Sequence, residues 1–209
     1  MFSILNPHKC YNLSVEMEKS NNSQDSSDLA KYREAWTCRD GRIVVLRPIG
    51  SQDKAIEKEL INGLSLEKSR YRFFCPIKAN EEVLNWACDI DYKNEIAIMA
   101  EYNSGEKKRN VGVVRLSVEP NLKTGEFAIL VADDFQNCGL GTKLMNILIK
   151  IGLERELDSI YGIVLADNYK MLTLMKEFGF IVEERSYDEV KLRRQLKFRP
   201  VEEEKALEK

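Results

Sequence analysis

The sequence predicts an α/β (α+β) domain in which about four helices flank a mixed, mostly antiparallel sheet of about seven strands. Apolar runs of strand length recur along the chain, each bounded by glycine, proline or polar residues. Two of these runs flank the polar stretch 103–110, which contains Gly105, and they therefore predict an antiparallel hairpin. One long segment instead has the apolar repeat of an amphipathic helix that packs on a sheet, formed by Leu140, Leu144, Ile147, Leu148 and Ile151.

The first part of the domain is predicted to contain a strand followed by two helices. The strand covers residues 43–47, where β-branched and apolar residues precede a proline. Ser51 can cap the first helix, whose apolar residues recur every four positions at Ile56, Leu60 and Leu64. The second helix covers residues 81–88.

The remainder of the domain is predicted to be richer in strands. They lie at residues 96–102, 111–118, 126–132, 160–165, 180–187 and 190–198. The long helix follows the third of them. Asn168 can cap a last helix, and Gly179 suits the exit from that helix.

A chain of 209 residues fits one domain of ordinary size with tails at both ends. Residues 1–35 are expected to form a polar, largely disordered tail, because the stretch 16–31 has too few apolar groups to offset the entropy of ordering. Residues 201–209 form a charged C-terminal tail. The compact domain is therefore expected to span residues 36–200.

The charge distribution does not suggest a nucleic-acid partner. The formal net charge is −2, with 32% charged and 44% hydrophobic residues, as in an ordinary soluble domain. The one markedly basic stretch, 191–199, alternates with apolar residues and is typical of the solvent-facing side of a strand.

Cysteine and histidine usage argues against a metal site and against a disulfide framework. The chain has 5 cysteines at scattered spacings and 1 histidine. Neither a basic leader followed by an apolar stretch nor an apolar run of membrane-spanning length is present. We therefore expect a cytoplasmic protein without a membrane partner.

Two glycines stand at the junction between strand 126–132 and the long helix. At Gly139 and Gly141 the backbone has no side chains in the way, so its N–H groups can approach an anion, and the helix N-terminus favours a phosphate. Gly-x-Gly also marks tight turns without a ligand. A dinucleotide fold does not fit because the preceding strands form hairpins, and a P-loop does not fit because only Thr142 follows, without the Lys-Ser/Thr pair.

The stretch Gln136-Asn137-Cys138-Gly139-Leu140-Gly141 resembles the Gln/Arg-x-x-Gly-x-Gly/Ala signature of GNAT acetyltransferases, which holds the coenzyme A pyrophosphate. The predicted element order also matches the GNAT acyl-CoA N-acyltransferase fold. Across most of residues 36–190 the chain is similar to the catalytic domain of bacterial protein lysine acetyltransferases. The matching segments are Asp40–Arg42, Leu46–Ile49, Ser69–Phe74, Asp89–Tyr92, Gly125–Ala128 and Ala166–Asn168.

This resemblance implies acetyl-CoA as the acyl donor and a set of residues that bind it. The backbone of Ile129, Leu130 and Val131 would pair with the pantetheine amides, since pantetheine can act as an extra strand. Asn168 would lie near the thiol end. The pyrophosphate would be surrounded by the signature and the residue after it, namely Gln136, Asn137, Cys138, Gly139, Leu140, Gly141 and Thr142. Direct transfer requires no metal.

A base is needed because a primary ammonium must lose its proton before it attacks a thioester, and lysine has a reference pKa near 10.4. The resemblance implies that Glu126 is this base, directly or through water. The alternative is an exposed, solvated carboxylate at the start of a strand. Many GNAT enzymes carry a general-acid tyrosine seven residues after the asparagine, but here that position is Met175.

We therefore expect an N-acetyltransferase for a primary amine, with a protein lysine as the favoured acceptor. A small-molecule amine acetyltransferase and a non-catalytic acyl-CoA-sensing module remain alternatives. Packing is the expected role of Cys138, whereas Lys143 pairs with a phosphate or is solvated. Four aromatic residues either pack in the core or line the acceptor groove: Tyr71, Phe73, Phe74 and Trp86. The sequence does not indicate the oligomeric state.

Overall fold

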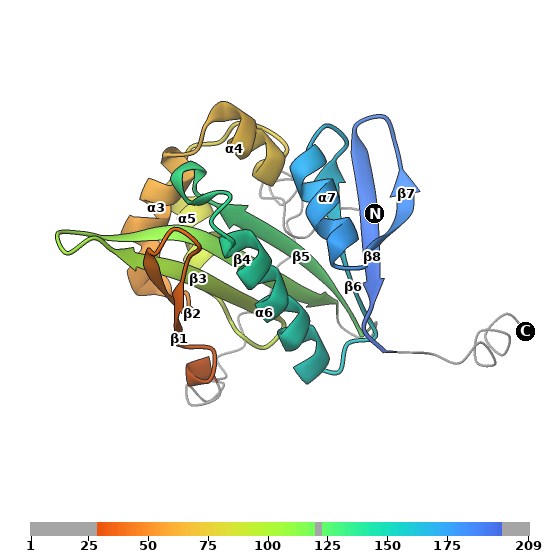
Figure 1. The fold of residues 1–209 in the computed structure, drawn as a ribbon, viewed down its shortest axis with the longest axis horizontal. Coiled ribbons are helices and arrows are strands. Elements are labelled where there is room, and N and C mark those ends of the chain that lie inside the picture. Colours follow the sequence, from red (N-terminus) through yellow and green to blue (C-terminus); the bar gives the residue numbers. More distant parts are fainter. Residues whose placement is uncertain (1–28, 120–122, 198–209) are drawn as a thin grey trace, which may run out of the picture.

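The fold is known from a computed structural model that describes residues 29–119 and 123–197. The predicted C-terminal tail and most of the predicted N-terminal tail lie outside the described residues. One sheet of eight strands runs in the order β1-β2-β3-β4-β5-β6-β8-β7 (Figure 1). The strands are β1 (Glu34–Thr37), β2 (Ile43–Pro48), β3 (Glu95–Asn103), β4 (Lys108–Glu119), β5 (Thr124–Val131), β6 (Ser159–Leu165), β7 (Ile181–Arg185) and β8 (Glu189–Gln195).

One pair of neighbouring strands in this sheet, β5 and β6, is parallel. All other neighbouring strands are antiparallel, as in the predicted hairpins. The parallel pair β5–β6 is short: only Thr124, Gly125 and Glu126 of β5 have partners on β6, namely residues 159–161. Beyond Glu126, β5 pairs with β4 alone among the described strands. The two central strands therefore diverge and leave a wedge-shaped opening.

Five α-helices of the described chain cover the two faces of the sheet. They are α3 (Lys54–Asn62), α4 (Leu66–Phe73), α5 (Glu81–Cys88), α6 (Leu140–Glu154) and α7 (Tyr169–Glu177). Helices α6 and α7 lie on one face, and α3 and α5 lie on the other (Figure 1). Short 3₁₀ turns, η1 (Ser51–Asp53) and η2 (Asp133–Phe135), precede α3 and α6.

Helix α6 has the predicted apolar face, and its close approach to the sheet depends on a glycine of β4. Leu140, Leu144 and Leu148 are fully buried, and each such side chain contributes about 1.5–3 kcal/mol to stability. A Cβ on Gly112 would lie 3.2 Å from side-chain carbons of both Leu140 and Leu144. The absence of a side chain at Gly112 thus lets the N-terminal end of α6 rest directly against the centre of the sheet.

The predicted α/β architecture of a mixed, mostly antiparallel sheet flanked by helices is confirmed, with one strand and one helix more than expected. The additional elements are β1 and α4. The predicted cap of the first helix is wrong: the carboxylate of Asp53, not Ser51, accepts the N–H of Gly50 at 2.8 Å. The cap of the last helix is confirmed, since Asn168 Oδ1 accepts the N–H of Met171 at 3.2 Å.

Residues 29–35, which we assigned to the N-terminal tail, are packed on the domain. Tyr32 is buried, and its hydroxyl donates to Glu154 of α6 at 2.6 Å. Strand β1 begins at Glu34, whose carboxylate pairs with Lys143 at 2.6 Å. Lys143 thus has an ion-pair partner within the domain that neither sequence interpretation named.

Candidate active site

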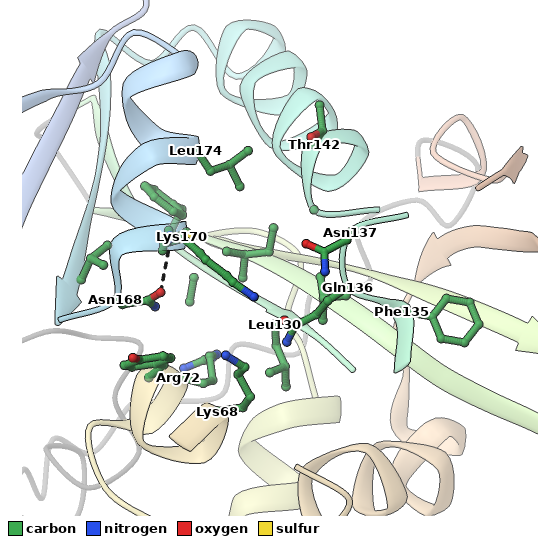
Figure 2. Close-up of a pocket in the computed structure, with 18 of the residues that line it drawn as sticks. Lys68, Arg72, Leu130, Phe135, Gln136, Asn137, Thr142, Asn168, Lys170 and Leu174 are labelled. Carbon is green, nitrogen blue, oxygen red and sulfur yellow. Dashed lines mark hydrogen bonds between the residues drawn. The ribbon is translucent and has the colours of Figure 1, made fainter. Parts of the chain in front are cut away.

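A cavity of about 370 Å³ opens where β5 and β6 diverge. Its walls are β5, the loop before α6, the first turns of α6 and α7, and helix α4 (Figure 2). The edge of β5 beyond Glu126 faces this cavity instead of a neighbouring strand. Unpaired strand backbone at a cavity wall offers N–H and C=O groups to an amide-rich ligand.

Most residues predicted to bind the cofactor lie together on this cavity. They are Ile129, Leu130, Val131, Gln136, Asn137, Gly139, Gly141, Thr142 and Asn168. Cys138 and Leu140 do not line it. The Cys138 thiol is buried 2.9 Å from the carbonyl oxygen of Phe135, and Leu140 is fully buried in the core. Their side chains therefore pack, as expected for Cys138, and only their backbone can serve a ligand.

The loop before α6 has the shape of an anion-binding turn. Asn137 and Gly139 both have positive φ, 61° and 90°. Gly139 is the N-cap of α6 and offers no side-chain acceptor, and the first turn contains no acidic residue. The first N–H groups of a helix have no intrahelical acceptor, and the helix dipole places partial positive charge beside them. This turn therefore presents donors and a positive potential to the cavity.

Replacing Gly139 by alanine is expected to weaken coenzyme A binding and to lower the free energy of unfolding by about 1–2 kcal/mol. The reason is its positive φ, and a Cβ there would also lie 3.4 Å from Nε of Arg39. Gly141→Ala is the matched control for the loss of stability: it lies inside the helix, and the nearest atom to its Cβ would be 3.8 Å away. Its stability should stay equal or rise by up to about 1 kcal/mol. Chemical denaturation and calorimetric titration with coenzyme A measure both effects. Equal free energies of unfolding for the two variants would contradict the role of the positive φ at Gly139.

Four cations on the cavity wall could not be inferred from the sequence, because they belong to separate segments of the chain. Arg39 follows β1, Lys68 and Arg72 belong to α4, and Lys170 belongs to α7. Figure 2 shows Lys68, Arg72 and Lys170 extending into the cavity. Glu126 is the one acidic residue among the described residues of the wall. Such a cavity suits a polyanion.

Arg72 is buried, which is unusual for an arginine. Burial and, after it, the nearby charge of Arg115 lower the pKa of Arg72 to about 10, although the charges of Glu57, Glu126 and Glu95 act in the opposite direction. Arg72 therefore remains charged at neutral pH and acts electrostatically on Glu126.

Glu126 is not the exposed, solvated carboxylate that the sequence left as an alternative. Its residue surface is 2% exposed, and it lies at the cavity wall where the β5–β6 pairing ends. The hydroxyl of Tyr161, its partner on β6, is 3.5 Å from Glu126 Oε2. This carboxylate therefore lies at the cavity wall with its solvent access restricted.

The position at which the resemblance places a general-acid tyrosine in many GNAT enzymes is occupied here by a core residue. Met175 is fully buried in the main apolar cluster and does not line the cavity. Of the four aromatic residues expected either to pack in the core or to line the acceptor groove, two do each. Tyr71 and Phe74 line the cavity, whereas Phe73 is buried and Trp86 packs against the clusters behind it.

Neither a metal centre nor a membrane span is found in the part of the chain that the structure describes. Within residues 29–119 and 123–197, three or more His, Cys, Asp or Glu side chains are nowhere grouped so as to hold a metal ion. In the same ranges, no helix is sufficiently long and apolar to cross a bilayer.

The model of the acetyltransferase (GNAT) family matches residues 62–180, which include the α4 wall, the loop before α6 and Asn168. The chain belongs to the GNAT family of acetyltransferases. It is 32% identical over 164 residues to the acetyltransferase PA5475 of Pseudomonas aeruginosa, covering 77% of this chain and 88% of that protein.

Two solved GNAT structures share the fold of this acetyltransferase. The GNAT domain of PAT from S. lividans has a TM-score of 0.71 and 22% identity, covering 79% of this chain and 98% of that one. Spermidine N-acetyltransferase from Vibrio cholerae, in complex with CoA and spermine, has a TM-score of 0.61 and 23% identity, covering 73% and 95%. At 22% and 23% sequence identity, these two structures show that the fold is shared. They do not show whether the acceptor is a protein or a small amine.

The residues present fit the acyl donor of GNAT enzymes. The protein is a GNAT acetyltransferase, and the GNAT fold binds acetyl-CoA. Acetyl-CoA has an amide-rich arm and a polyanionic end. The free edge of β5 offers hydrogen-bonding groups to the amide-rich arm. The glycine turn and its surrounding cations offer donors and positive charge to the polyanionic end.

Proposed function

We propose that this enzyme transfers an acetyl group from acetyl-CoA to a protein lysine side chain, with Glu126 as general base. The observation that carries the proposal is the position of Glu126. It is the acidic group of an otherwise cationic cavity, and it lies where the divergence of β5 and β6 begins. An amine that enters at this point meets a carboxylate able to take its proton.

Three parts of the cavity would hold the donor. The β5 edge at residues 129–131 would pair with the pantetheine amides, and the turn at residues 136–142 would bind the pyrophosphate together with Arg39. Asn168 would meet the arm near its thiol end. Its Oδ1 already accepts from Met171, so the amide N–H groups are the donors it can offer.

The chain's own residues would then act on the acceptor. Bound acetyl-CoA supplies an activated carbonyl carbon. Glu126 removes one proton from the acceptor ammonium, which leaves a neutral amine able to attack that carbon. A backbone N–H at the β5 edge stabilises the negative charge on the carbonyl oxygen during attack. The C–S bond then breaks as the attacking nitrogen loses its second proton. Because Met175 is buried, the leaving thiolate takes that proton directly or through water, and the helix N-termini at the cavity stabilise its charge until then.

The charges of the cavity favour a protein lysine over a polyamine. Lys68, Arg72 and Lys170 all extend into it (Figure 2). A polyamine would bring several positive charges into this surrounding, whereas a lysine side chain brings one, which Glu126 neutralises. The similarity of residues 36–190 to bacterial protein lysine acetyltransferases supports the same acceptor.

The test is an acceptor panel assayed by release of the coenzyme A thiol. Wild-type enzyme is given acetyl-CoA with blocked lysine peptides, with the same peptides carrying dimethyl-lysine, and with spermidine, spermine and simple amines. We expect thiol release and acetyl-lysine, identified by mass spectrometry, with the unmodified peptides only. Turnover of small amines alone would replace the proposal by a small-molecule acetyltransferase. Tight acetyl-CoA binding without turnover of any acceptor would indicate an acyl-CoA sensor.

A further inference from the structure

The burial of Glu126 creates a requirement that the base itself cannot meet. If Glu126 takes a proton from each acceptor, as the proposed function holds, that proton must leave before the next turnover. Glu126 is 2% exposed, and the cavity beside it would be filled by substrates. Because a buried carboxylate exchanges protons with water poorly, a protein group that connects it to solvent would be useful.

Two further residues on the same face of the sheet provide such a connection. Tyr161 of β6 is the direct partner of Glu126 in the parallel pair, and its hydroxyl oxygen is 3.5 Å from Glu126 Oε2. The same oxygen is 2.5 Å from Oε1 of Glu119, the last residue of β4. Glu119 is only half-buried. The phenol of Tyr161 on β6 thus contacts both the buried carboxylate of Glu126 on β5 and the partly exposed carboxylate of Glu119 on β4.

The hydrogen-bond capacities of the three groups define the direction of this connection. A phenol has one O–H to donate and lone pairs to accept with. The short contact shows that Tyr161 donates to Glu119, which leaves its lone pairs for Glu126. An ionised Glu126 has no proton to donate, so its contact with that oxygen is long. Once protonated, Glu126 can donate to Tyr161 and the contact can shorten.

The surroundings keep Tyr161 neutral and fixed in place. Burial raises its pKa well above the ordinary value, and the hydrogen bond to Glu119 raises it further. Lys191 and Arg193 of β8 lie 5.2 Å and 5.1 Å from its ring centre, and both pair with Glu183 of β7. These cation–π contacts hold the ring without using its hydroxyl. A neutral phenol that is already donating is suited to pass a proton through without ionising.

We propose that Tyr161 and Glu119 relay the proton from Glu126 to solvent. The O–H bond of protonated Glu126 breaks as that proton bonds to the Tyr161 oxygen. At the same time the original hydroxyl proton of Tyr161 passes to the Glu119 carboxylate, which then releases it to water. The sum is one proton moved: Glu126 is again a carboxylate, and Tyr161 and Glu119 regain their starting states after the hydroxyl reorients.

Kinetics of Tyr161→Phe test the relay, because this change removes the hydroxyl and keeps the ring under Lys191 and Arg193. With the best acceptor among blocked lysine peptides and spermine, kcat should fall about tenfold or more, and KM for acetyl-CoA should be unchanged. Raising imidazole at fixed pH and ionic strength should restore kcat, since a small base can carry the proton instead. Glu119→Gln should behave in the same way.

Controls separate the relay from packing and from the role of Glu126. Tyr187→Phe makes the same chemical change at an exposed position and should have wild-type kinetics, insensitive to imidazole. Wild-type kcat in Tyr161→Phe, or a loss that imidazole does not restore, would overturn the relay. Glu126→Gln is assayed in parallel: if it keeps full turnover, the proposed base fails, whereas if only it is inactive, the relay alone fails.

Discussion

Glu126→Gln should lower kcat for acetyl transfer by about 10²- to 10⁴-fold, the usual contribution of a general base. The amide has nearly the same shape as the carboxylate but cannot take a proton. Coenzyme A affinity should remain within about twofold of wild type, a change of roughly 0.4 kcal/mol. This is because Glu126 belongs to β5, whereas the glycine turn at Gly139 lies at the start of α6. Steady-state thiol release and calorimetric titration with coenzyme A measure the two quantities.

Glu106→Gln is the matched control for this experiment. It makes the same substitution at an exposed position in the β3–β4 connection and should leave both quantities unchanged. Full turnover in Glu126→Gln would exclude the carboxylate as base. Loss of coenzyme A binding together with turnover would mean that Glu126 organises the cavity, and the kinetic loss could then not be assigned to proton transfer.

The core elements could be predicted because their apolar residues repeat. Helix α6 buries the face that its sequence defines, and helix α5 has the predicted bounds, Glu81–Cys88. Asn168 was recognisable as a cap because a short polar side chain precedes an apolar repeat. In these segments local propensity and tertiary packing agree, and the sequence is then sufficient to predict the structure.

Helix α4 was not predicted because its buried face contains polar side chains. Arg72 and Ser69 are buried beside Phe73, and Ser69 Oγ accepts the N–H of Ile77 at 3.0 Å. A search for apolar repeats misses a helix whose inner face carries an arginine and a hydroxyl. One local signal was present: Ser65 caps the helix by accepting the N–H of Lys68 at 3.4 Å. Recognising that cap would have placed the helix.

The candidate site was predictable only where it is contiguous in sequence. Glu126, the β5 edge and the glycine turn lie within one stretch, so strand and turn patterns were enough to group them. The wall formed by Arg39, Lys68, Arg72 and Lys170 assembles only in the folded chain. The position of Tyr161 beside Glu126 follows from the β5–β6 register, which no local sequence pattern determines.

Replacing Arg47 by methionine should lower the free energy of unfolding by about 3–5 kcal/mol at neutral pH. Its guanidinium donates to Asp53 at 2.8 and 2.7 Å and to Glu101 at 3.0 and 2.7 Å. The three side chains are 13%, 5% and 8% exposed. Methionine fills similar space but leaves two neighbouring carboxylates buried without this partner. Arg47→Lys keeps the charge and loses the planar, two-sided geometry, so its loss should be intermediate.

The pH dependence of this loss distinguishes electrostatics from packing. Burial acts to raise the pKa values of Asp53 and Glu101, but the hydrogen bonds and charge of Arg47, together with the N–H of Gly50 at Asp53 and Lys108 at Glu101, outweigh it, and both pKa values lie below normal. The pair therefore stabilises the wild type above the unfolded pKa values of about 4, and this stability is lost as pH falls through the folded pKa values. In Arg47→Met the contribution of Arg47 is lost and both folded-state pKa values rise, so this variant loses less stability than the wild type on acidification. The difference between the two proteins should be largest at pH 7 and shrink on acidification in urea denaturation. A difference independent of pH would assign the loss to packing alone.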